Sequence, residues 1–125
     1  MVVLLAYYKV RPDVDLDELG KIGRRMSELA RSRTDFGFRG GRYFKDDDGL
    51  SVAIYEFDDL DGLERFRRDP EHVAVQRRGA EFFEWMRNDV CVVERQDPRA
   101  RFRSTRPHSG AKRVLLRRPL DAPLA

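Results

Sequence analysis

The sequence predicts an α+β fold in which the order strand, helix, hairpin, helix, strand builds a four-stranded antiparallel sheet. Three observations lead to this prediction. The run "VVLLAYYKV" near the start is apolar on both of its alternating faces. A segment with apolar residues at helical spacing follows it. Two short strand-like runs then flank an Asp-Gly pair, which is a strong local signal for a hairpin.

The first strand is expected over residues 2–10 and the first helix from residue 16 onward. Asp15 is a predicted N-cap, and Glu18 stands three residues later at capping-box spacing. The apolar side chains that repeat at helical spacing are Leu16, Leu19, Ile22, Met26, Leu29 and Ala30. We expect this helix to end between Ser32 and Asp35.

The second and third strands are expected over residues 36–45 and 50–57, joined by "KDDDG". Three adjacent aspartates suggest calcium, but an EF-hand loop alternates its acidic ligands and ends on a distant Glu. A solvated turn is therefore the prediction here, and no metal site is expected in the chain.

The remaining segment predicts a short helix near Leu60, Leu63 and Phe66 and then a second main helix. Asp69 as N-cap and Pro70 at the first helical position mark the start of that helix. We expect it to run to about residue 86 and the last strand to cover residues 88–96. This order is the split β-α-β arrangement of ferredoxin-like folds.

Both faces of the predicted sheet are apolar, although two helices can cover only one of them. Val3, Leu5 and Tyr7 share one face of the first strand, whereas the other face carries Leu4, Ala6, Tyr8 and Val10. The face without helices needs a partner, and the simplest partner is a second copy of the chain. A homodimer is predicted.

Charge divides the chain into an acidic body, residues 1–97, and a basic C-terminal extension, residues 98–125. The body carries 17 Lys and Arg against 21 Asp and Glu, and the extension carries 8 against one. A single cysteine, Cys91, permits no intrachain disulfide and reads as an inert packing thiol in a strand. No run approaches the length of a membrane helix and no signal peptide is evident, so a cytoplasmic protein without membrane contact is expected.

The stretches "DFGFRGGRYFKDDDG" and "VAIYEFDDLDGLERFRRDPEHVAVQRRGAEFFEWMRNDVCVVER" resemble the antibiotic-biosynthesis monooxygenase family. The shared features are a Gly-Phe before the second strand, the hairpin Gly, an aromatic closing the third strand and "PEH…QRRG" opening the last helix. The resemblance covers about residues 2–95. It implies ferredoxin-like protomers that pair into a dimeric α/β barrel.

The resemblance also implies candidate chemistry, namely cofactor-independent oxidation of an aromatic or polyketide-type small molecule. The quinone-forming members use Asn, Trp and Tyr at positions that hold Ala53, Phe57 and Leu63 here, so none matches. The haem-degrading members place Asn, Trp and a His ligand at positions that hold Tyr8, Phe66 and Val75. Haem degradation is therefore disfavoured, and no cofactor is expected.

His72 is the predicted catalytic residue. Helical spacing turns it toward the sheet, where a neutral imidazole could take a proton from an acidic phenol or enol. The alternative is a histidine that caps its helix or sits half-solvated at the rim. The predicted substrate-binding residues, an aromatic lining with one polar side chain, are Tyr8, Tyr55, Phe57, Phe66 and Gln76. Aromatic residues of this kind fill cores more often than they bind ligands.

Two classes of function remain open from the sequence. One is a small cofactor-free oxygenase, and the other is a non-catalytic dimer that binds a small ligand or a partner. Nucleic-acid binding is the less favoured form of the second class. The stretch "DFGFRGG" resembles an RNA-stacking motif, but it falls on the second strand, whereas RNA-binding modules of this topology carry that motif on the third.

Overall fold

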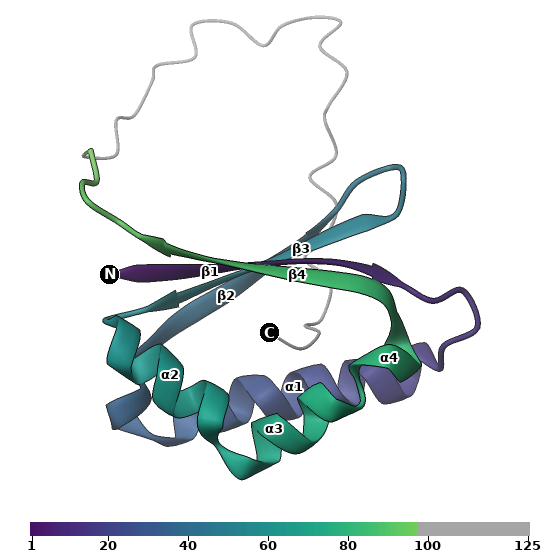
Figure 1. Cartoon of the computed structure of the whole chain (residues 1–125), viewed down its shortest axis with the longest axis horizontal. Coiled ribbons are helices and arrows are strands. Elements are labelled where there is room, and N and C mark those ends of the chain that lie inside the picture. The colour runs from purple at the N-terminus through teal and green to yellow at the C-terminus, as the bar shows by residue number, and fades with distance from the viewer. Residues whose placement is uncertain (98–125) are drawn as a thin grey trace, which may run out of the picture.

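The computed structural model describes residues 1–97, which form one sheet covered by helices on one side (Figure 1). The strands are β1 (Val2–Val10), β2 (Phe38–Lys45), β3 (Leu50–Phe57) and β4 (Phe83–Val92). The helices are α1 (Leu16–Ser32), the 3₁₀ turn η1 (Thr34–Phe36), α2 (Leu60–Arg68), α3 (Pro70–Arg77) and α4 (Gly79–Phe82). The basic extension lies outside the described residues.

The sheet has the order β2-β3-β1-β4, and all of its strand pairs are antiparallel. The predicted four-stranded antiparallel α+β fold is thus confirmed. Helices α1 to α4 all lie on the same face (Figure 1). Successive side chains of a strand point to opposite faces of the sheet, and in the two central strands, β1 and β3, burial alternates accordingly between the helix-covered face and the open face.

Helix α1 begins where the sequence predicts. The Asp15 carboxylate accepts hydrogen bonds from the backbone N–H groups of Asp17 and Glu18, at 3.0 and 3.1 Å. The capping-box spacing suggested that the Glu18 carboxylate would also accept from the backbone N–H of Asp15, but this hydrogen bond is not formed within residues 1–97. The Glu18 carboxylate instead accepts from the Arg78 guanidinium at 2.6 Å and so links α1 to the α3–α4 junction.

The joint between α1 and β2 differs slightly from the prediction. Phe36 closes the 3₁₀ turn instead of opening the strand, and β2 begins at Phe38. Gly37 lies between them with φ of 63°, in the left-handed region that suits glycine. Phe36 is fully buried, so this stretch plugs one end of the core.

The predicted hairpin is confirmed. One Asp46 carboxylate oxygen accepts from the backbone N–H groups of Asp48 and Leu50, at 2.9 and 2.8 Å. Gly49 completes the turn with a φ of 85°. The first aspartate of "DDD" therefore supports the turn itself.

The prediction that the last helix runs to about residue 86 is wrong. Helix α3 ends at Arg77, the short α4 follows, and β4 already begins at Phe83. The backbone of Arg11 donates to the Phe82 carbonyl at 2.8 Å, and Lys9 pairs with Trp85 in the β1–β4 register. Pairing with the long central strand β1 overrides the helical spacing of this aromatic segment.

Apolar side chains of the open face remain partly exposed. Val3, Leu5 and Tyr7 of β1 adjoin Val52 and Ile54 of β3, and all five are half-buried. Phe44 and Trp85, at the margins, are 39 % and 46 % exposed. Cys91, predicted as a packing thiol, is exposed on this face opposite Val3. The face combines apolar and aromatic residues with charged ones such as Arg87, whose guanidinium stacks on Tyr7 at 4.5 Å.

Gly62 of α2 fixes the contact between this helix and η1. A Cβ atom on Gly62 would lie 2.2 Å from the Phe36 carbonyl oxygen, so Gly62→Ala requires the backbone to move. We expect this substitution to lower the free energy of unfolding by about 2 kcal/mol, the size typical of overpacking. Urea denaturation of the two proteins measures the difference.

Gly79→Ala is the matched control, because a Cβ at Gly79 meets no atom within 4 Å and its φ is not positive. That variant should be neutral or more stable by up to about 1 kcal/mol. Equal stability of wild type and Gly62→Ala would contradict the predicted clash.

Candidate functional site

Two cavities lie on the helix-covered side of the sheet. The larger has a volume of about 690 Å³ and opens where β1 runs into the loop before α1, beside the β2–β3 hairpin. The smaller has about 10 Å³, which holds one water molecule at most. Only the larger cavity falls within the size range of ligand sites, about 300–1,000 Å³.

Two of the residues that line the larger cavity, Tyr8 and Ser51, carry buried hydroxyl groups. Tyr8 and Ser51 are each 1 % exposed, and they face one another as a register pair of β1 and β3. Within residues 1–97, neither hydroxyl oxygen has a hydrogen-bond partner of acceptable geometry. Leaving such a group unpaired costs about 1–3 kcal/mol, so this part of the cavity lining is suited to a polar ligand atom.

Tyr8 stays neutral over the physiological pH range. Burial is the largest influence on its phenol and raises the pKa well above the usual value. The Ser51 hydroxyl, which lies close to the phenol without meeting hydrogen-bond geometry, lowers the pKa. A neutral phenol can donate a hydrogen bond but cannot act as a general base. Tyr8 is therefore a candidate for stabilising negative charge on an oxygen atom of a bound molecule.

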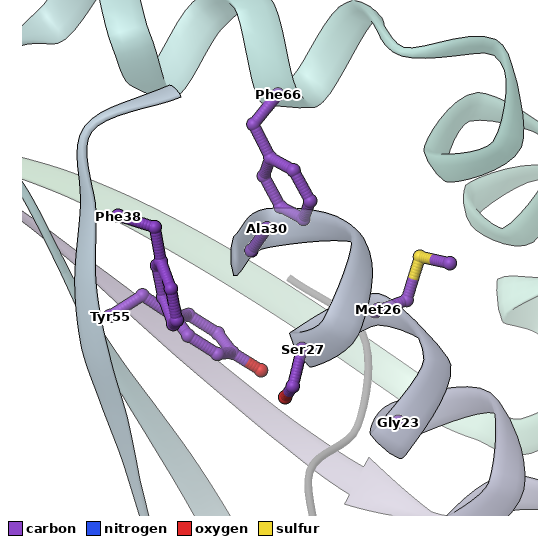
Figure 2. Close-up of a pocket in the computed structure, with 7 residues that line it drawn as sticks. All are labelled: Gly23, Met26, Ser27, Ala30, Phe38, Tyr55 and Phe66. Atoms are coloured by element: carbon purple, nitrogen blue, oxygen red, sulfur yellow. The ribbon is translucent and has the colours of Figure 1, made fainter. Parts of the chain in front are cut away.

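Tyr55 and Phe66 line the smaller cavity together with Gly23, Met26, Ser27, Ala30 and Phe38. Figure 2 shows Phe38 beside Tyr55 on the sheet, Phe66 reaching in from α2, and the Tyr55 hydroxyl turned toward Ser27 of α1. Burial, followed by the influence of Tyr43, raises the pKa of Tyr55 well above the usual value. Tyr55 and Phe66 thus line a space too small for an aromatic ligand.

His72 is fully buried, and its ring packs against Phe66 with centroids 4.5 Å apart. Its Nδ1 lies 3.3 Å from the Arg67 carbonyl oxygen, so a proton on this nitrogen would be donated to the backbone. His72 lines neither of the two cavities. Its catalytic role stays a prediction, and the geometry favours packing between α2 and α3.

The other two predicted residues, Phe57 and Gln76, do not line the larger cavity either. Phe57 is buried in the core at 1 % exposure and contacts Phe38 and Phe66 edge-on or tilted. Gln76 is exposed on α3 and lines neither cavity. Of the predicted set, only Tyr8 lies on the cavity that is large enough for a ligand.

Sequence reasoning missed Ser51 and the charged residues around the cavity mouth. The signal for Ser51 was present, because the alternation of "LSVAIYEF" puts this polar residue on the same face as Ala53, Tyr55 and Phe57. Lys21 and Lys45 carried no comparable signal. They come from α1 and β2 and meet at the cavity only through the fold.

Within residues 1–97, no group of three or more His, Cys, Asp or Glu side chains is placed to hold a metal ion. No helix of that part of the chain is long and apolar enough to cross a membrane.

Comparison with known proteins supports the fold. No protein-family profile matches the chain. No curated protein matches it either. Among solved structures, a proposed antibiotic biosynthesis monooxygenase from Deinococcus radiodurans is 10% identical with a TM-score of 0.67, over 80% of this chain and 99% of that one. SnoaB, a cofactor-independent oxygenase from Streptomyces nogalater, is 15% identical with a TM-score of 0.65, over 78% and 97%.

A third similar structure is a dimeric protein of unknown function with a ferredoxin-like fold from Bacteroides fragilis. It is 24% identical with a TM-score of 0.51, over 72% of this chain and 93% of that one. The resemblance to antibiotic-biosynthesis monooxygenases is thus confirmed as a shared ferredoxin-like fold.

Proposed function

We propose that the chain is a small cofactor-independent oxygenase that oxidises an aromatic or polyketide-type molecule in the larger cavity. The observation that carries this proposal is the pair of buried, unpaired hydroxyl groups of Tyr8 and Ser51 on that cavity. The fold shared with a cofactor-independent oxygenase gives it further support.

The proposed reaction needs no reductant besides the substrate. A phenol or enol with an acidic neighbouring CH₂ loses a proton to solvent at the open side of the cavity. Tyr8 donates a hydrogen bond to the resulting enolate oxygen and stabilises the carbanion form. The carbanion passes an electron to O₂, and recombination forms a carbon–oxygen bond and a hydroperoxide. Loss of water converts the original CH₂ and O₂ into a carbonyl and H₂O.

Oxygen uptake with anthrone-type substrates tests this role of Tyr8. Tyr8→Phe should lower kcat/KM about 100-fold, because removing one donor to a developing oxyanion has an effect of that size. Tyr7→Phe is the matched control. It removes the same hydroxyl group from a tyrosine on the open face, where the Tyr7 ring stacks with the Arg87 guanidinium. Equal rates for wild type and Tyr8→Phe would contradict the mechanism.

The catalytic role of His72 is tested by measuring both oxygen uptake and the melting temperature of His72→Gln. If His72 is the general base, His72→Gln abolishes turnover while the melting temperature is retained. If it packs α3 against Phe66, stability falls and kcat of the folded fraction is kept.

Binding without turnover is the second candidate function. It is favoured by the three positions where quinone-forming relatives place functional side chains. Here these positions hold Ala53, Phe57 and Leu63, which are fully buried in the core. Saturable binding of aromatic molecules without oxygen uptake across a diverse substrate panel would select this function.

We further propose that two chains pair through their open sheet faces. The half-buried Leu5 and Ile54 lie side by side at the centre of that face, and a similar ferredoxin-like structure is described as dimeric. The protein of 14.7 kDa should therefore sediment at twice this mass. Ile54→Lys should sediment as a monomer, because it puts a charge into the interface.

Leu60→Lys is the control for this test, because Leu60 is 47 % exposed at the start of α2, away from the open face. A monomeric wild type, or a dimer that Ile54→Lys leaves intact, would contradict pairing through this face.

A further inference from the structure

The larger cavity is surrounded by positive charge, although the body of the chain is acidic. The residues that line it include five cationic ones, Lys9, Arg11, Lys21, Arg24 and Lys45, and one acid, Asp17. Strand alternation puts the Lys9 side chain on the open face, so four cations and one carboxylate remain, a net charge of +3. Residues 1–97 as a whole carry 17 basic against 21 acidic side chains, a net charge of −4. The excess of cations is therefore a local property of this cavity.

Some of these cations have partners within the fold. Lys9 forms an ion pair with Glu84 at 3.4 Å, and Arg11 donates to the Ala80 carbonyl at 2.8 Å. Lys21 and Lys45, by contrast, form no ion pair with any residue between 1 and 97. Both lysines are exposed, so they stand at the rim of the cavity and are available to a ligand.

The two kinds of polar group are separated in depth. The hydroxyls of Tyr8 and Ser51 are buried, whereas Lys21 and Lys45 are at the solvent side. Val10, Leu16 and Leu19 add apolar surface to the same cavity. A cleft lined by one sign of charge raises the local concentration of oppositely charged molecules. The lysine ammonium is a compact charge with three rotatable donors, which suits an exposed anion without fixing its geometry.

We infer that the ligand of this cavity is a flat aromatic molecule with a hydroxyl or enol oxygen at one end and an anionic group, such as a carboxylate, at the other. The oxygen bonds to Tyr8 and Ser51, and the anionic group is held by Lys21 and Lys45. This inference rests on the proposed function for the place of binding, and it adds the charge of the substrate.

Binding of 6-hydroxy-2-naphthoate and of its neutral amide, 6-hydroxy-2-naphthamide, to the full-length protein tests the inference by titration calorimetry. We expect the carboxylate to bind about tenfold tighter than the amide at low salt, since two exposed ion pairs together supply an effect of this size. The preference should shrink at about 0.5 M salt, where exposed charges are screened. Lys21→Gln/Lys45→Gln should abolish it.

The matched control is Arg68→Gln/Arg77→Gln, which removes two positive charges from exposed positions on α2 and α3 that do not line the cavity. This variant should keep the tenfold preference. Equal affinity for both ligands in the wild type, or a preference that survives in Lys21→Gln/Lys45→Gln, would overturn the inference.

Tyr8→Phe separates the failure of this inference from that of the proposed function. If wild type binds both ligands equally and Tyr8→Phe weakens both, the cavity binds aromatic molecules and only the charge preference is wrong. If neither ligand binds to the wild type, the charge inference and the ligand-binding role of the cavity fall together.

Discussion

The sheet is apolar on both faces, but helices cover only one of them (Figure 1). This asymmetry determines the roles of the two faces. The helix-covered face holds the core and the cavities, where Leu4, Ala6 and Ala53 are completely buried. The open face keeps half-buried aliphatic side chains beside charged ones, a surface suited to a second copy of the chain. The proposed ligand binding and the proposed pairing thus use opposite sides of the same strands.

On the helix-covered face, polar groups are retained at a cost in stability. An unpaired buried hydroxyl costs about 1–3 kcal/mol, a large share of the 5–15 kcal/mol that holds a domain folded. Tyr8 and Ser51 both bear this cost beside the larger cavity, and the Asn88 carbonyl oxygen is also buried without a partner in the described part of the chain. In the proposed binding mode, a ligand oxygen at Tyr8 and Ser51 would recover part of that free energy, which would favour a polar aromatic molecule over a purely apolar one.

Periodicity was enough to predict most of the fold, because β1, α1 and the hairpin each have one dominant pattern with clear caps. It failed at the last helix, because Phe82, Phe83 and Met86 fit helical spacing, and the strand accommodates Phe83 and Met86 through a register shift between Lys9 and Val10 that alternation does not predict. The strand forms because it pairs with the second edge of β1, the edge that β3 does not occupy. The site was harder to predict. Tyr8 followed from alternation, but His72 packs in the core and Gln76 faces solvent. The lysines of the rim meet through tertiary structure alone.

The most direct test of the central claim is a crystal structure of the protein with 6-hydroxy-2-naphthoate bound. The claim is that this cavity holds an aromatic ligand by the two buried hydroxyls. The ring should lie between α1 and the start of the hairpin, with its phenol oxygen about 2.5–3.0 Å from the hydroxyl oxygen of Tyr8 or Ser51. A ligand seated on the open sheet face, or one in the cavity with its phenol turned away from both hydroxyls, would contradict the claim.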